Sequence, residues 1–346
     1  MAKMFRSLVC IVGLASMAAP GQELPPLRNT VFGINYVPAH VPESTDADAV
    51  QALLECRALG GHLSYIWEWP SGDKGLNDGA KLAAAAKELG FELTLQMSPT
   101  AIGAPVLPSG LQGTSFRDPD VRSRYLDDIG KMARLEADYF ILAAEINLLY
   151  EVNPREFDSF VTLYREAYKL VKGISPKTKV GVSLHMDMLF SFSQFSILPR
   201  LEPQDFIGLT SYPHWLVADG VYKSVEDIPL WYYKRLRLLI AKPIIFTEIA
   251  WPTGGRSSIE QQTAFVKRLP ELMRGVNPEV ITWALQHDVK HFQTRWLTEQ
   301  QIAILLGYKV DPEVLFDELN TMGLLSWDGP PKPAWLEALN YPLRSK

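Results

Sequence analysis

The sequence has almost no cysteine, since Cys10 and Cys56 are the two among 346 residues. A disulfide-rich secreted scaffold is therefore excluded. Beyond the N-terminal stretch it also lacks an uncharged apolar run of about 20 residues, so no membrane-spanning helix is expected in the mature chain. A basic excess is missing too: 34 basic residues stand against 39 acidic ones, and the net charge is −5. We therefore expect no nucleic-acid partner.

The N-terminus carries the pattern of a targeting segment. Lys3 and Arg6 precede an apolar run from 8 to 15, and small residues follow up to Ala19. This order predicts a secretory signal peptide over 1–19, with residues 20–346 forming a secreted or periplasmic domain that has no membrane contact. An uncleaved anchor or a first helix is the alternative. Cleavage would remove Cys10 and leave Cys56 alone, which excludes an intrachain disulfide.

The rest of the chain is 47% hydrophobic and alternates short apolar runs with amphipathic ones, which predicts one large α/β core. The strand-like runs are 31–35, 62–67, 91–97, 139–144, 179–185, 206–210, 243–247 and 280–285. The helical patterns between them include 46–59, 76–89, 118–135, 157–171 and 259–274. These eight runs recur about every 36 residues, and we predict a single (β/α)8 TIM barrel. An open doubly wound sheet is less favoured, because no glycine-rich phosphate turn follows the first strand.

In a TIM barrel the chemistry lies at the carboxyl ends of the strands. Those ends carry carboxylates, amides and aromatic residues but no Lys or Arg, which argues against phosphate handling. Glu145 and Glu248 each terminate an apolar run, in the predicted fourth and seventh strands. Either glutamate alone could cap a helix or bind a backbone amide. Together they indicate a catalytic pair, because both would lie at one end of the barrel.

The segment 247–252 reads Thr-Glu-Ile-Ala-Trp-Pro. It is similar to the nucleophile segment of the retaining β-glycosidases of clan A, and most of all to that of the β-1,3-glucanases and endo-β-1,4-galactanases. Segments 143–147, 207–213 and 281–283 resemble the acid/base segment, the tyrosine segment of strand six and the tryptophan segment of strand eight. The resemblance implies a glycoside hydrolase with Glu145 as acid/base, Glu248 as nucleophile and Tyr212 touching the nucleophile.

Retaining hydrolysis needs one protonated and one ionised carboxyl group. We expect Glu145 to hold the proton and Glu248, hydrogen-bonded by Tyr212, to stay ionised. A carboxylate pair could instead bind a metal with His185 and Asp187, but the sequence has no recognisable zinc pattern. We therefore expect neither a metal nor a cofactor.

Further strand-end residues are candidate contacts to a carbohydrate substrate, although each could equally be structural. They are Asn35, Tyr36, Trp67, Gln96, Asn147, His185, Trp251 and Trp283. The resemblance makes Trp283 the floor of a sugar subsite. We expect the protein to act as a monomer.

One departure from the family pattern stands beside the acid/base residue. The family's asparagine before that glutamate is Ala144 here. Asn147 and His185 are the nearest candidates to replace its contact to the sugar. Without a replacement, the chain would be a non-catalytic or weakly active carbohydrate-binding protein on the same barrel.

Overall fold

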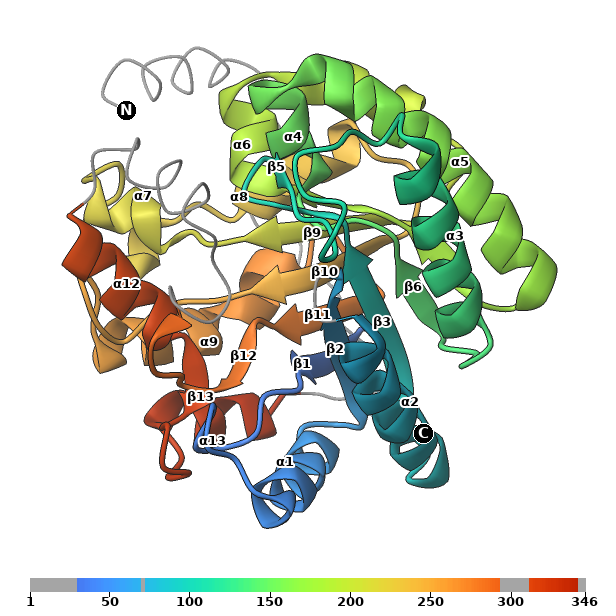
Figure 1. Cartoon of the computed structure of the whole chain (residues 1–346). Coiled ribbons are helices and arrows are strands. Elements are labelled where there is room, and N and C mark those ends of the chain that lie inside the picture. The colour runs from blue at the N-terminus through green and yellow to red at the C-terminus, as the bar shows by residue number, and fades with distance from the viewer. Residues whose placement is uncertain (1–29, 70–71, 293–310, 342–346) are drawn as a thin grey trace.

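A computed structural model describes residues 30–69, 72–292 and 311–341 (Figure 1). The signal peptide predicted for residues 1–19 lies outside this part of the chain, and its cleavage stays a prediction. No helix among the described residues is both long and apolar enough to cross a membrane.

Parallel strands form a barrel at the centre of the fold. The strands are β1 (Val31–Asn35), β2 (His62–Glu68), β3 (Glu92–Ser98), β6 (Tyr139–Ile141), β7 (Lys179–Gly181), β8 (Ser183–His185), β9 (Ile207–Ser211), β10 (Ile244–Ile249) and β11 (Val280–Trp283). Their order is β7-β6-β3-β2-β1-β11-β10-β9-β8. Because β7 and β8 are the two halves of one strand broken at Val182, this order closes on itself. The prediction of a single (β/α)8 barrel is confirmed.

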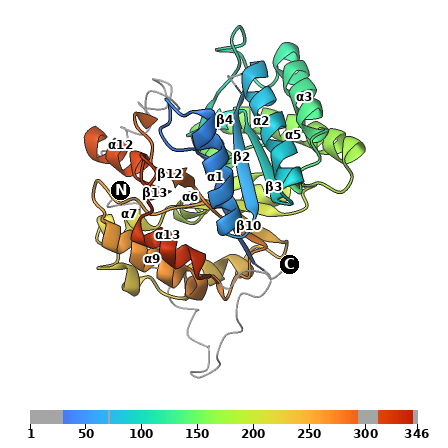
Figure 2. The same cartoon turned by 90° about the horizontal axis from the view of Figure 1, so that it is seen from below.

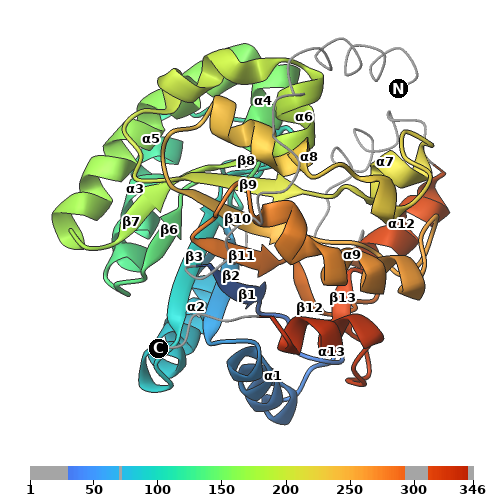
Figure 3. The same ribbon diagram turned by 180° about the vertical axis from the view of Figure 1, so that it is seen from behind.

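Helices surround the barrel and follow the strand ends. The α-helices are α1 (Asp46–Ala58), α2 (Gly72–Glu88), α3 (Pro119–Ala133), α4 (Ile146–Val152), α5 (Pro154–Ile174), α6 (Met186–Ser191), α7 (His214–Ala218), α8 (Trp231–Lys234), α9 (Ile259–Met273), α12 (Pro312–Asn320) and α13 (Pro333–Leu339). Short 3₁₀ helices are η4 (Gln194–Leu201), η5 (Val225–Asp227) and η6 (Arg235–Leu238). In the outer layer α3 packs on α5 (Figure 2), and α13 packs on α9 (Figure 3).

Two small sheets extend the carboxyl end of the barrel. The antiparallel hairpin of β4 (Thr100–Ala101) and β5 (Ala104–Pro105) follows β3. The strands β12 (Leu285–His287) and β13 (Gly323–Leu325) pair in parallel just after β11. This second pair carries the chain from the last barrel strand towards α12 and α13.

The barrel interior is filled from its amino end. Tyr139, Ile141, Phe206, Ile245 and Val280 form a separate buried cluster, and all but Ile141 lie within one residue of the start of a strand. This apolar plug leaves the polar strand ends at the opposite, carboxyl end, as in other barrels of this class.

Two glycines permit the close approach of strands where the barrel closes. The Gly208 amide donates to the Val182 carbonyl oxygen over 2.9 Å. A Cβ atom on Gly208 would lie 2.9 Å from that oxygen and 2.9 Å from Cγ2 of Thr247. At Gly181 a Cβ would lie 2.7 Å from the Phe206 carbonyl oxygen. The broken strand therefore closes the barrel because no side chains stand between the backbones.

We predict that Gly208→Ala lowers the free energy of unfolding by about 1–3 kcal/mol, the usual cost of overpacking. Thermal unfolding of the parent and the variant measures the loss. Gly173→Ala is the matched control, because Gly173 is exposed in α5 and a Cβ there meets no atom within 4 Å. The free energy of unfolding of that control variant should rise by about 0.5–1 kcal/mol. Equal stability of the two variants would contradict this account of the closure.

Candidate active site

Glu145 lies in a strained turn at the carboxyl end of the fourth barrel strand. Its backbone is left-handed, with φ of 47°, a conformation that is costly for a residue with a Cβ and is found most often at functional sites. Hydroxyl groups hold the turn in place. The Ala144 amide donates to Oγ of Ser98 over 2.9 Å, and the Glu145 amide donates to Oγ of Ser183 over 3.1 Å. Neighbouring strands thus fix the backbone that aims the Glu145 carboxyl.

Glu248 lies near the end of β10, beside an irregularity in strand pairing. The register of β10 against β9 shifts between Phe246 and Glu248, and Glu248 is then the Cα partner of Thr210. Such bulges re-aim a side chain and are common beside active sites. Here the shift leaves Glu248 half-buried between fully buried neighbours.

Each carboxyl group accepts a hydrogen bond from β9 or from the residue that follows it. The Tyr212 hydroxyl donates to Oε2 of Glu248 over 2.6 Å, and the Thr210 hydroxyl donates to Oε1 of Glu145 over 2.6 Å. The side chain of Gln96, near the end of β3, also lowers the pKa of Glu248. The predicted contact between Tyr212 and Glu248 is therefore present. Residues from β3, β6, β9 and β10 converge on the pair.

The electrostatics of the pair differ from the expectation for Glu248. Burial and then the charge of Glu145 raise its pKa to about 7, against the hydrogen bonds from Tyr212 and Gln96 that lower it. Glu248 is thus about half ionised near pH 7, whereas the sequence led us to expect a fully ionised carboxylate. Burial holds the pKa of Tyr212 well above its ordinary value, so this phenol stays a hydrogen-bond donor.

The raised pKa of Glu248 predicts a pH-dependent gain in stability when its charge is removed. A folded-state pKa of about 7 against an ordinary 4.5 means that the fold favours the protonated form. Protonated Glu248 therefore contributes to the free energy of unfolding below pH 4.5, and this contribution is lost as the pH rises through 7. Glu248→Gln should be more stable than the parent by on the order of 1–3 kcal/mol at pH 8 and equal to it at pH 4. Thermal unfolding at both pH values measures this, and a pH-independent difference would refute it.

Three predicted sugar contacts lie with the carboxyl pair at this end of the barrel. Asn35, which is 2% exposed, donates from Nδ2 to the Ala284 carbonyl oxygen over 3.1 Å. Its Oδ1 is buried and has no hydrogen-bond partner among the described residues. Gln96 contacts Glu248, and the His185 ring lies 5.8 Å from the Tyr212 ring.

Two other predicted contacts have structural roles instead. Asn147 donates from Nδ2 to the His185 carbonyl oxygen and to Oε1 of Gln194, and its Oδ1 accepts from the His185 amide at 2.7 Å. Both ends of this amide are occupied, so Asn147 does not replace the asparagine missing at Ala144. The Tyr36 hydroxyl donates to the Ala49 carbonyl oxygen over 3.2 Å and ties the first strand to α1.

The three predicted tryptophan platforms are buried, which corrects their assignment. Trp67 is 1% exposed, and Trp251 and Trp283 are 0% exposed. The Trp283 indole donates to the Met322 carbonyl oxygen over 2.7 Å, and the Trp251 indole donates to Oγ of Ser257 over 2.5 Å. Both rings pack against Phe265 of α9. Trp283 faces the helical layer because alternate residues of β11 point to opposite sides, and Trp251, just after β10, packs against the same helix. Neither ring therefore offers a face to a sugar.

Sequence reasoning missed the residues that hold the pair. Thr210 could have been found, since it lies two positions before Tyr212 and so on the same side of the strand. Asp187 was considered as a metal ligand but acts as a brace. It accepts from the Tyr212 amide at 3.3 Å and from the Tyr232 hydroxyl. Within the described ranges, no group of three or more His, Cys, Asp or Glu residues is arranged to hold a metal.

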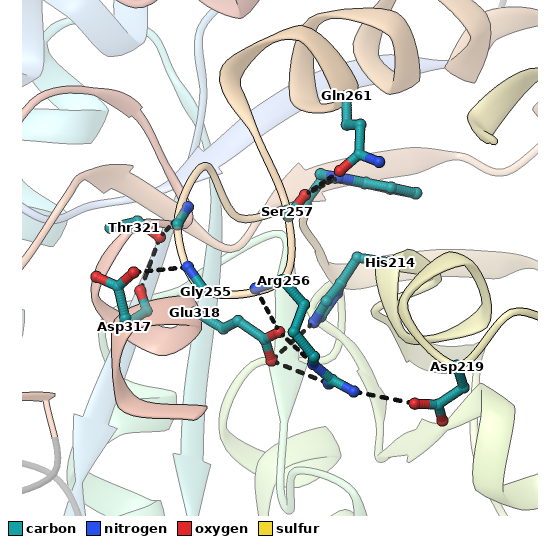
Figure 4. Close-up of polar contacts among 11 residues, drawn as sticks. His214, Asp219, Gly255, Arg256, Ser257, Gln261, Asp317, Glu318 and Thr321 are labelled. Atoms are coloured by element: carbon teal, nitrogen blue, oxygen red, sulfur yellow. Dashed lines mark hydrogen bonds and ion pairs between the residues drawn. The ribbon is translucent and has the colours of Figure 1, made fainter. Parts of the chain in front are cut away.

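A polar cluster braces the loop that follows Glu248 (Figure 4). Asp317 and Thr321 accept from the amides of Gly255 and Gly254 at 2.6 and 2.9 Å. Glu318 of α12 is 1% exposed and accepts from Nε of Arg256 at 2.9 Å. On its other side Nε2 of His214 lies 3.7 Å away, and burial lowers the pKa of that histidine. The brace thus joins α12 to the loops after β9 and β10.

Removing the Glu318 carboxylate should break this brace. We expect Glu318→Ala to lower the free energy of unfolding by about 3 kcal/mol, because Arg256 and the loop amide lose their buried acceptor. Thermal unfolding measures the effect. Glu313→Ala, at an exposed position of the same helix, should change it by less than about 0.5 kcal/mol. If Glu318→Ala lowers the free energy of unfolding no more than the control does, the cluster does not contribute to stability.

Comparisons with known proteins identify the class of the fold. No protein-family model matches the chain, and no curated protein matches its sequence. Solved structures do match. A GH5_18 enzyme variant from Bifidobacterium longum subsp. longum, in complex with Manβ1-4GlcNAc, is similar with a TM-score of 0.67 and 18% identity, over 90% of this chain and 78% of that one.

Two further structures are similar over most of this chain. The GH53 catalytic domain of Ignisphaera aggregans has a TM-score of 0.62 and 16% identity, over 94% of this chain and 99% of its own. The exo-β-1,4-mannosidase Op5Man5 from Opitutaceae bacterium strain TAV5 has a TM-score of 0.66 and 15% identity, over 90% of this chain and 59% of its own. The structural neighbours are glycoside hydrolases, and the families GH5 and GH53 among them are clan A TIM-barrel enzymes. At these identities the likeness shows a shared fold.

Proposed function

We propose that this protein is a retaining glycoside hydrolase that acts on β-linked oligosaccharide or polysaccharide. The observation that carries the proposal is the carboxyl pair at the ends of the fourth and seventh barrel strands. Glu145 lies close enough to Glu248 for its charge to raise the pKa of Glu248. Each carboxyl also accepts a 2.6 Å hydrogen bond from a hydroxyl group. The shared barrel fold with glycoside hydrolases supports the same function.

The arrangement suits a double-displacement reaction. Ionised Glu248 attacks the anomeric carbon while protonated Glu145 donates its proton to the leaving oxygen, and the glycosidic electron pair stays on that oxygen. Glu145 then takes a proton from water, which attacks the anomeric carbon and releases Glu248. Because Glu248 must be ionised, kcat/KM should fall on the acid side of about pH 7.

The substrate class follows from the polar groups near the pair. Asn35, Gln96 and His185 carry hydrogen-bonding side chains suited to hydroxyl groups. Trp67, Trp251 and Trp283 provide no stacking face. The GH5_18 neighbour was solved with Manβ1-4GlcNAc, so we place β-mannosides first among the candidate substrates. We further propose that the protein is exported and acts as a monomer.

A carbohydrate-binding protein without turnover is the second candidate. Ala144 favours it, because a methyl group stands where the resembling enzymes carry an amide beside the acid/base residue. The occupied amide of Asn147 removes one of the two expected replacements. Fold alone does not separate a binding protein from an enzyme.

Reducing-sugar release from a panel of β-mannans, β-glucans and β-galactans tests the proposal directly. We expect the parent to hydrolyse at least one of them, and NMR of the first product should show the β-anomer. Glu248→Gln should abolish turnover while binding of the same sugar persists, because the amide cannot attack carbon. Gln204→Leu is the control, since Gln204 precedes β9 and its buried side-chain atoms make no hydrogen bond in the described structure. A parent that binds sugar but releases none supports the second candidate.

A further inference from the structure

One short segment supplies the donors to both candidate catalytic carboxyls. Thr210 donates to Glu145 and Tyr212 donates to Glu248, each over 2.6 Å. The two donors are two residues apart, so both side chains point to the same side of β9 and its extension. Thr210 itself is fully buried.

The segment is anchored on its other side. Oγ of Ser211, between the two donors, lies 3.2 Å from the Tyr233 hydroxyl. The Tyr212 amide donates to Asp187. Thr210 is also the Cα partner of His185 on β8 and of Glu248 on β10. These contacts leave Thr210 little freedom to move away from Glu145.

We propose that Thr210 is a positioning residue for the acid/base group, directing one oxygen of Glu145 towards the leaving group of the substrate. The proposal rests on the proposed function. The Thr210 hydroxyl holds Oε1 of Glu145, so Oε2 is left to carry the proton and exchange it. A single short donor that is itself buried and fixed restricts the rotation of the carboxyl about its last bond.

The hydroxyl also stabilises the charge that forms during the reaction. When Oε2 gives its proton to the glycosidic oxygen, the bond from that oxygen to the anomeric carbon breaks. Glu145 then becomes a carboxylate. A hydrogen bond to a charged acceptor is stronger than one to a neutral acceptor, so the Thr210 donor stabilises this state more than the starting state. The Thr210 hydrogen bond should therefore contribute most to the rate for substrates whose leaving group must be protonated.

Aryl β-glycosides with different leaving groups separate this role from a structural one. The sugar is the one that the parent hydrolyses in the panel above. A phenyl glycoside needs protonation of its leaving oxygen, whereas a 2,4-dinitrophenyl glycoside departs without it. We expect Thr210→Val to lower kcat/KM for the phenyl glycoside about 10- to 100-fold and to change that for the dinitrophenyl glycoside less than about threefold. Thr210→Ser, which keeps the hydroxyl, should recover most of the loss.

Thr247→Val is the matched control. The Thr247 hydroxyl lies on the neighbouring strand and donates to the Leu209 carbonyl oxygen over 3.2 Å, away from Glu145. Like Thr210→Val, this substitution replaces a buried hydroxyl group with a methyl group. Any loss in this variant should therefore be equal for the two glycosides.

The outcomes separate this inference from the proposed function. A parent active on both glycosides, with a Thr210→Val loss confined to the phenyl glycoside, supports the positioning role. An active parent whose Thr210→Val variant loses both rates equally overturns the positioning role alone. A parent inactive on every glycoside of the panel overturns the proposed function and this role together.

Discussion

The constraint on which this site depends is the placement of two carboxyl groups close together in a partly buried position. Burial and mutual repulsion both oppose ionisation, and they raise the pKa of Glu248 to about 7. Neutral side chains stabilise the two carboxyl groups. Tyr212 and Gln96 lower the pKa of Glu248, and Thr210 donates a hydrogen bond to Glu145. Neutral donors allow one carboxyl to remain protonated while the other ionises, which a nearby arginine would prevent.

These donors can hold the carboxyl groups only if the strands that carry them keep a fixed register. Closure of the barrel at Val182 fixes β9 against its neighbours, and the absence of a side chain on Gly208 allows it. The bulge in β10 then brings Glu248 level with Thr210. On the outer side, α12 holds the loop after β10 through Glu318 and Arg256. The geometry of the carboxyl pair thus also depends on contacts between strands and on the contact of α12 with the loop after β10.

The barrel could be predicted from the sequence because strand-like and helical patterns alternate along the whole chain. The eight apolar runs are separated by enough chain for a helix, and each expected strand begins within one residue of the observed one. The site was predicted less completely because orientation matters there. β6 ends at Ile141 rather than 144, and the chain then turns through the left-handed Glu145. Trp283 was expected in the site because of the family resemblance, although it is the last residue of β11 and packs against α9.

The remaining question is what compensates for Ala144. Asn147 is excluded, because its amide joins α4 to the start of α6. Gln96 on β3 lowers the pKa of Glu248, and the buried Oδ1 of Asn35 on β1 has no partner in the described part of the chain. A sugar attached to Glu248 would carry its 2-hydroxyl next to that carboxylate, where the Gln96 amide already lies. Under the proposed function, the Gln96 amide on strand three is therefore the candidate replacement for the amide missing on strand four.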